Sequence, residues 1–222
     1  GPLAGSGTLE TSRTLPGSVT PDLRSGSPAA GRSQPPGAAA CGPGLPAAVS
    51  RRPWVSTKPI TTSAPLAQRY FHQGMALTWG LNPAEAARSF AAAAEIDLGC
   101  ALCYWGIAWA SGPNINSDMT PEDAARVRDA LVRARGAANR ASPRDRELIA
   151  ALSARHPVAG DAATLDEAAY ADRMRELARR YPLDANLATL AAEAQLNLHP
   201  YDWWTGDGGA RPWTGEIRAL LA

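Results

Sequence analysis

Apolar residues recur three or four positions apart over most of the chain from residue 65 to residue 222. This spacing is typical of helices that bury one face. Gly, Pro, Asn and Asp residues interrupt the pattern and divide it into segments of helical length. The predicted helices cover residues 65–80, 83–97, 100–111, 120–139, 143–156, 165–181, 184–198 and 215–222. The predicted fold class is therefore all-α.

Three of these helices carry a hydroxyl residue where they are expected to begin. Ser63, Thr120 and Thr164 are each predicted to cap a helix, because a side-chain oxygen can accept a hydrogen bond from a free backbone N–H of the first turn. Pro65 and Pro121 fit the first turn, where no backbone donor is needed.

The first two helices are predicted to form a hairpin, and a single hairpin cannot bury its apolar face alone. Counting from Ala67 as position one, large and small residues fall at regular points, and the register continues in a second unit from Ala101. The residues expected to pack the repeat are Tyr70, Gly74, Ala86, Phe90, Ala93, Tyr104, Ile107 and Ala108. The small members would let two helix backbones approach closely, and the aromatic members would fill the space beside them.

This register resembles the tetratricopeptide repeat (TPR) family, whose period is about 34 residues. Gln73 and Leu98 depart from the family's pattern. Residues 64–222 also resemble a group of divergent bacterial TPR proteins, through Tyr-Trp-Gly at 104–106, Gly-Pro-Asn-Ile-Asn at 112–116, and the aromatic segment 198–208. The resemblance implies a TPR-like helical hairpin solenoid, a right-handed superhelix. It also implies that further repeats follow and that the chain is the N-terminal portion of a longer one.

Residues 1–62 differ in composition from the rest. They hold ten of the 19 prolines and nine of the 20 glycines, and their only aromatic residue is Trp54. With so little apolar mass they are predicted to form a disordered tail, which leaves residues 63–222 as the folded domain. No run of about 18 apolar residues is present, so no membrane span is expected. Without a visible signal peptide the default location is cytoplasmic, and an extracytoplasmic one is open because Gly1 stands where Met is expected.

Cys100 and Cys103 stand three residues apart at the start of a predicted helix. A zinc site needs four ligands, and a haem attachment needs His directly after the second Cys, where Tyr104 stands. The favoured interpretation is that both thiols pack in the core, since free Cys is among the most often buried residues. A reactive thiol or a local disulfide is the alternative, because a helix N-terminus lowers a thiol pKa.

Two polar loops are the candidate binding sites. Asn114 and Asn116, with Asp118, could hold a cation or a peptide, but short polar side chains more often bond their own backbone in a turn. The second loop gathers aromatic and ionisable residues: His199, Tyr201, Asp202, Trp203, Trp204, Asp207 and Trp213. These are expected either to fold back on the domain or to anchor a partner.

The arginines at 126, 133 and 140 recur every seven residues, but neighbouring carboxylates cancel their field, so nucleic acid is not an expected partner. No catalytic residues, metal site or cofactor is predicted. The favoured function is a protein–protein interaction scaffold of TPR type that binds a peptide or partner protein in a helix-lined groove. The alternative is a metal- or small-molecule-binding enzyme whose site combines the loops 112–118 and 199–208.

Overall fold

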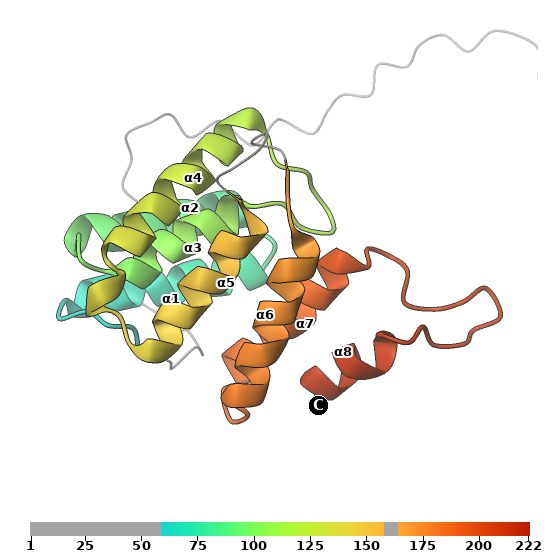
Figure 1. The fold of residues 1–222 in the computed structure, drawn as a ribbon. Coiled ribbons are helices and arrows are strands. Elements are labelled where there is room, and N and C mark those ends of the chain that lie inside the picture. The colour runs from blue at the N-terminus through green and yellow to red at the C-terminus, as the bar shows by residue number, and fades with distance from the viewer. Residues whose placement is uncertain (1–58, 158–163) are drawn as a thin grey trace, which may run out of the picture. The chain divides into compact units, whose positions relative to one another are not determined.

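The computed structural model describes residues 59–157 and 164–222, and within these ranges the fold is all-helical without β-strands (Figure 1). The α-helices are α1 (Pro65–Trp79), α2 (Pro83–Ile96), α3 (Ala101–Ser111), α4 (Pro121–Gly136), α5 (Pro143–Arg155), α6 (Glu167–Arg180), α7 (Ala185–Leu198) and α8 (Thr214–Leu220). A 3₁₀ turn, Ala138–Arg140, follows α4. Each helix predicted from the sequence is confirmed, with bounds that shift by at most three residues.

Most helices begin at a polar cap. Thr120 and Asp123 form a reciprocal capping box at α4, as the sequence predicts in part. The other two predicted caps are wrong. Ala64 precedes α1 without a side-chain cap, and Asp166, not Thr164, accepts the backbone N–H of Ala169 at the start of α6. A carboxylate is the better cap at α6, because it also interacts favourably with the positive end of the helix.

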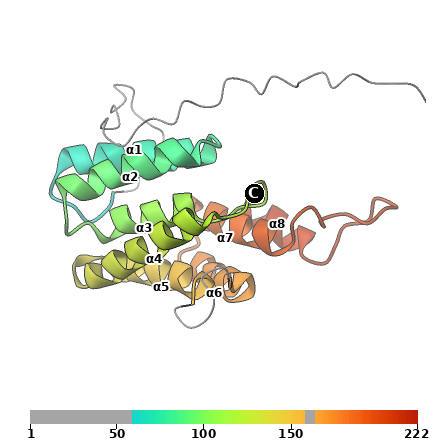
Figure 2. The ribbon, with the colours of Figure 1, turned by 90° about the horizontal axis from the view of Figure 1, so that it is seen from above.

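Successive helices pack against one another in chain order. The hairpins α1–α2 and α3–α4 lie in neighbouring layers, with α5 and α6 beyond them (Figure 2). The same order continues from α6 to α7 and from α7 to α8. This arrangement is that of a helical repeat, in which each unit contacts the next one along the chain.

Most of the residues predicted to pack between the helices are buried. Six of the eight side chains or glycine positions are buried: Gly74, Ala86, Phe90, Ala93, Tyr104 and Ala108. Tyr70 and Ile107 are only half-buried, and both still pack against the core. The buried set joins α1, α2 and α3 into one apolar cluster.

The folded part begins earlier than the composition indicates. Residues 59–62, which the sequence analysis places in the tail, lie against the helices, and Ile60 is buried with 7% of its surface exposed. Proline and glycine content marks the boundary poorly here, because one buried aliphatic side chain and two hydrogen bonds to Gln68 and Asp97 hold this short segment in place. The rest of the predicted tail, residues 1–58, lies outside the described residues.

Candidate functional site

A small apolar pocket, termed the groove, lies where the odd-numbered helices α1, α3, α5 and α7 come together. Each of these four helices contributes two side chains one helical turn apart. The pairs are Phe71 and Met75 on α1, Leu102 and Trp105 on α3, Arg144 and Leu148 on α5, and Asn186 and Leu190 on α7. A stack of helices that pack in chain order produces this regularity, because alternate helices lie on the same side.

Ile60 lies in this groove. Its side chain lines the same space as the helix residues, and the cavity left beside it measures only about 20 Å³. That volume corresponds to about one water molecule, so the groove is already filled by the chain itself. Spacing could not predict this contact, because Ile60 is a single aliphatic residue between Pro59 and Thr61.

The groove carries two polar features among its apolar side chains. The Arg144 guanidinium is held by the carboxylates of Asp184 at 2.7 Å and Asp145 at 2.8 Å, and both acids are buried. Trp105 is fully buried, and its indole Nε1–H has no hydrogen-bond partner in the described part of the chain. An unpaired buried donor costs free energy, which an added acceptor would recover.

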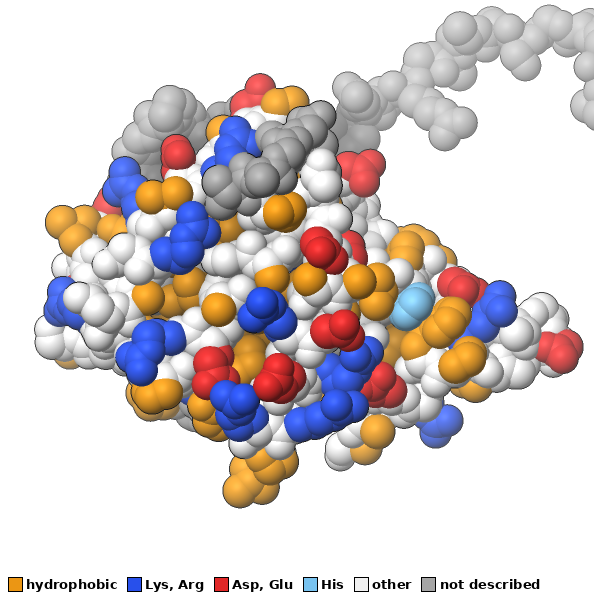
Figure 3. All heavy atoms as spheres, in the orientation of Figure 1, with side chains coloured by type: hydrophobic (Ala, Val, Ile, Leu, Met, Phe, Trp, Pro, Cys, Tyr) orange, Lys and Arg blue, Asp and Glu red, His pale blue; other side chains and the backbone are white. Residues whose placement is uncertain are grey.

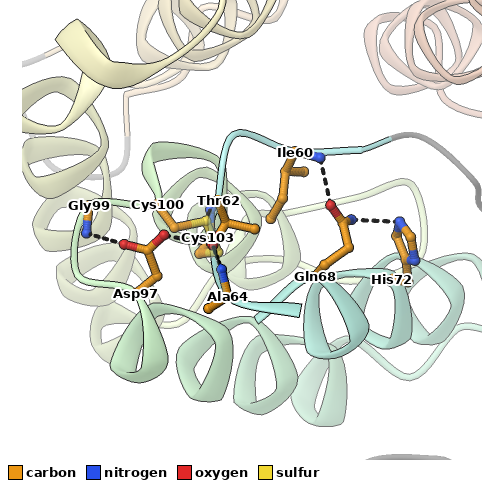
Figure 4. Close-up of a disulfide and its surroundings, with 9 residues drawn as sticks. All are labelled: Ile60, Thr62, Ala64, Gln68, His72, Asp97, Gly99, Cys100 and Cys103. Carbon is orange, nitrogen blue, oxygen red and sulfur yellow. Dashed lines mark hydrogen bonds between the residues drawn. A yellow bond between two sulfur atoms is a disulfide. The ribbon is translucent and has the colours of Figure 1, made fainter. Parts of the chain in front are cut away.

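Cys100 and Cys103 form a disulfide across the first turn of α3, and neither residue is exposed to solvent (Figure 4). The favoured sequence interpretation, two free thiols packed in the core, is therefore wrong about their oxidation state and correct about their burial. The Cα atoms are 5.3 Å apart, a separation that consecutive turns of one helix supply without backbone movement. Cys100 Sγ also accepts the backbone N–H of Cys103 as the helix cap.

The two candidate loops meet. The Tyr201 hydroxyl donates to the Ile115 carbonyl at 2.8 Å and lies 3.0 Å from Asn116 Oδ1. The Ile115 backbone N–H donates to Asn197 Oδ1 at 3.1 Å. Tyr201 itself has a left-handed backbone, with φ of 59°, which is uncommon for a residue with a Cβ. Asn114 forms the local turn that was favoured, since its Oδ1 accepts the backbone N–H of Asn116.

The ionisable residues of the aromatic loop are engaged within that loop. The His199 ring stacks on Trp213, with ring centroids 3.9 Å apart, and Asp202 pairs with Arg211 at 2.8 Å. Trp204 is exposed and pairs by backbone with Ala210 across the loop. His199 and Asp202 are therefore each held by a residue of their own loop.

A buried polar network, which the sequence pattern did not predict, lies beneath the loop at residues 112–118. Arg155 has 1% of its surface exposed, yet its guanidinium pairs with Glu167 at 2.8 Å and donates to the Pro113 carbonyl at 2.8 Å. Arg155 also lies 5.2 Å from the ring centre of Tyr170, a cation–π distance. The only signal was an arginine on the apolar stripe of α5.

Two ionisable groups of this region have shifted pKa values. Burial raises the pKa of Glu193, and the charge of Arg155 opposes that rise only in part. Burial, with a smaller contribution from the Arg155 charge, lowers the pKa of His156 to about 4. Both shifts come mainly from loss of water, so the network acts as packing that holds three helices and a loop together rather than as a proton-transfer site.

The predicted basic stripe is occupied by contacts within the protein. Arg126 pairs with Asp123, and Arg133 lies 5.9 Å from the ring centre of Tyr104. On the face that includes α5 and α6, Arg side chains lie among Asp and Glu side chains (Figure 3). That face therefore presents a mixed field rather than a basic surface.

Comparisons of the chain with protein-family models, curated proteins and solved structures found no match. Within residues 59–157 and 164–222, no three His, Cys, Asp or Glu side chains are grouped so that they could hold a metal ion. None of the helices in these ranges is both long and apolar enough to cross a lipid bilayer.

Proposed function

We propose that the chain is a protein–protein interaction scaffold of TPR type, which binds an extended segment of a partner protein in the groove lined by α1, α3, α5 and α7. One observation carries the proposal: the groove already accommodates a side chain of a non-helical segment, that of Ile60. Grooves of this kind recognise peptides through apolar pockets at regular spacing, with a few polar groups that set orientation.

The alternative, an enzyme built from the two polar loops, has weaker support. The loops meet through Tyr201, but His199 and Asp202 are held by Trp213 and Arg211. No nucleophile with an adjacent base stands at their junction among the residues described. The meeting of the loops is better explained as a brace between the end of α3 and the end of α7.

A peptide selection tests the scaffold function. A random peptide library is selected on the full chain, and the selected peptides are then measured on two variants of α7. Asn186→Trp fills the groove at a half-buried position, whereas Ala188→Trp places a Trp side chain on the other side of the same helix, away from the groove. We expect selected peptides to lose at least about tenfold in affinity for the first variant and little for the second. Equal loss on both, or no selected peptide, contradicts the proposal.

A further inference from the structure

Residues 59–64 have the pattern of exposure of an extended segment bound on a surface. Ile60, Thr62 and Ala64 face the protein and are buried or half-buried, and the three residues that alternate with them, Pro59, Thr61 and Ser63, are exposed. Side chains of an extended chain point to opposite sides in turn, so every second residue contacts the surface beneath. The segment therefore lies on the helices with alternate side chains facing them, and a tight turn bends it at Thr61, where the Thr62 backbone N–H donates to the Ile60 carbonyl at 3.0 Å.

The helices bind this segment through both its backbone and its side chains (Figure 4). Gln68 Oε1 accepts the backbone N–H of Ile60 at 2.8 Å, and the other end of the same amide lies 2.7 Å from His72 Nε2. His72 thus orients the Gln68 amide so that its oxygen faces the segment. A backbone N–H is common to all peptides, so this contact recognises an extended chain rather than a particular residue.

A second polar contact selects a side chain. The Thr62 hydroxyl donates to Asp97 Oδ2 at 2.6 Å, and Asp97 Oδ1 accepts the backbone N–H of Gly99. Asp97 is therefore fixed by the turn that leads into α3 and presents one oxygen to a hydroxyl. Two residues before that hydroxyl, Ile60 fills the groove.

From these contacts we infer that residues 59–64 are an intramolecular occupant of the partner groove, and that the partner is an extended segment with a branched aliphatic residue followed, two residues later, by Ser or Thr. This inference rests on the proposed function. The partner displaces the segment and takes over its contacts: the groove receives the aliphatic side chain, Gln68 the backbone N–H, and Asp97 the hydroxyl. The segment lowers the apparent affinity for the partner by keeping part of the molecules closed.

A peptide with the chain's own sequence at residues 57–66 is the probe. It is labelled with a fluorophore and titrated with three full-length proteins: the wild type, a variant with Ile60→Ala and Thr62→Val, and a control with Thr61→Ala. The double substitution weakens the internal segment and leaves the groove unchanged, whereas Thr61 is exposed. Far-UV circular dichroism checks that each protein keeps its helices. If the double variant loses its helices, the single variant Thr62→Val replaces it in the titration.

We expect the double variant to bind the probe at least about tenfold more tightly than the wild type and the Thr61→Ala control, as fluorescence anisotropy reports. A probe with Ile60→Asp should not bind. Equal affinities of wild type and double variant, or binding of the Asp probe, overturn the inference. If library peptides bind both proteins equally well, the scaffold function stands without internal competition. If no peptide binds either protein, both proposals fail.

Discussion

The ring of Phe90 on α2 packs directly on the backbone of Gly74 on α1, so that a Cβ at Gly74 would stand 2.6 Å from the Phe90 Cε1 atom. Gly106 on α3 lies as close to the other side of the same ring, because a Cβ at Gly106 would stand 2.4 Å from Phe90 Cδ1. Phe90 is fully buried between the two glycines and has no room to shift. The close packing of α1, α2 and α3 therefore requires glycine, which has no side chain, at positions 74 and 106.

Replacing either glycine should therefore destabilise the fold. We expect Gly74→Leu to lower the free energy of unfolding by about 2 kcal/mol or more, because the added side chain overpacks a site that cannot expand. Urea denaturation followed by circular dichroism measures this. Gly136→Ala is the control, since a Cβ at Gly136 contacts nothing within 4 Å and Ala favours the helix. A Gly74→Leu protein as stable as the wild type would contradict the packing register.

The sequence predicts this part of the fold because packing in a helical repeat is local. Gly74 and Phe90 are 16 residues apart, and their contact follows from the hairpin between them. The helices, their order and most packing positions could therefore be predicted from spacing alone. The tight fit between Gly106 and Phe90 could not be predicted in this way, because it depends on how α3 approaches α2.

The groove's occupant and the buried network could not be predicted from spacing. Ile60 lies in a segment whose composition resembles a tail, and one aliphatic residue carries no periodicity. Arg155 joins Pro113 and Glu167, which are 42 and 12 residues away. Such contacts depend on the three-dimensional arrangement of α3, α5 and α6, which the sequence pattern of each helix does not contain.

Removing the Arg155 charge should destabilise the fold strongly. Arg155→Met would leave the Glu167 carboxylate and the Pro113 carbonyl without their donor, and loss of one partner of a buried pair typically costs about 3–5 kcal/mol. Chemical denaturation measures the change. Arg180→Met is the matched control, because Arg180 forms exposed pairs, and exposed pairs contribute about 1 kcal/mol or less.

A double variant separates the pair from its surroundings. If Glu167→Gln is added to Arg155→Met, the carboxylate that lost its partner is no longer charged. The double variant should therefore lose less stability than the sum of the two single variants, by about 0.5–3 kcal/mol. Strict additivity would mean that Arg155 and Glu167 do not interact energetically.

His156 should make the fold sensitive to acid. Burial and the Arg155 charge lower its pKa from the ordinary 6.5 to about 4. Between these values the unfolded chain binds a proton that the folded chain does not, so stability is fully present above pH 6.5 and falls as the pH drops toward 4. The loss attributable to this group is at most about 3 kcal/mol, from a shift of roughly 2.5 pKa units.

His156→Gln isolates that contribution, because Gln does not titrate. The difference in unfolding free energy between wild type and variant should change across pH 6.5 to 4 and stay constant above pH 7. The raised pKa of Glu193 acts in the opposite direction, since its folded form binds the extra proton, but it is present in both proteins and cancels in the difference. A pH-independent difference would show that His156 titrates normally in the folded protein.

The Cys100–Cys103 disulfide should resist reduction as long as residues 59–64 stay in place. Both cysteines are inaccessible, and the segment passes the first turn of α3, held there by the bond from Thr62 to Asp97 (Figure 4). A dithiol must reach a sulfur atom to exchange with it, so reduction requires local opening. In native buffer with dithiothreitol, Thr62→Val should be reduced at least about threefold faster than the wild type. Mass spectrometry of the alkylated peptide that contains both cysteines gives the rate.

Thr61→Ala is the control, because it changes an exposed residue of the same segment, and its rate of reduction should match that of the wild type. Equal rates in all three proteins would show that the segment does not protect the disulfide.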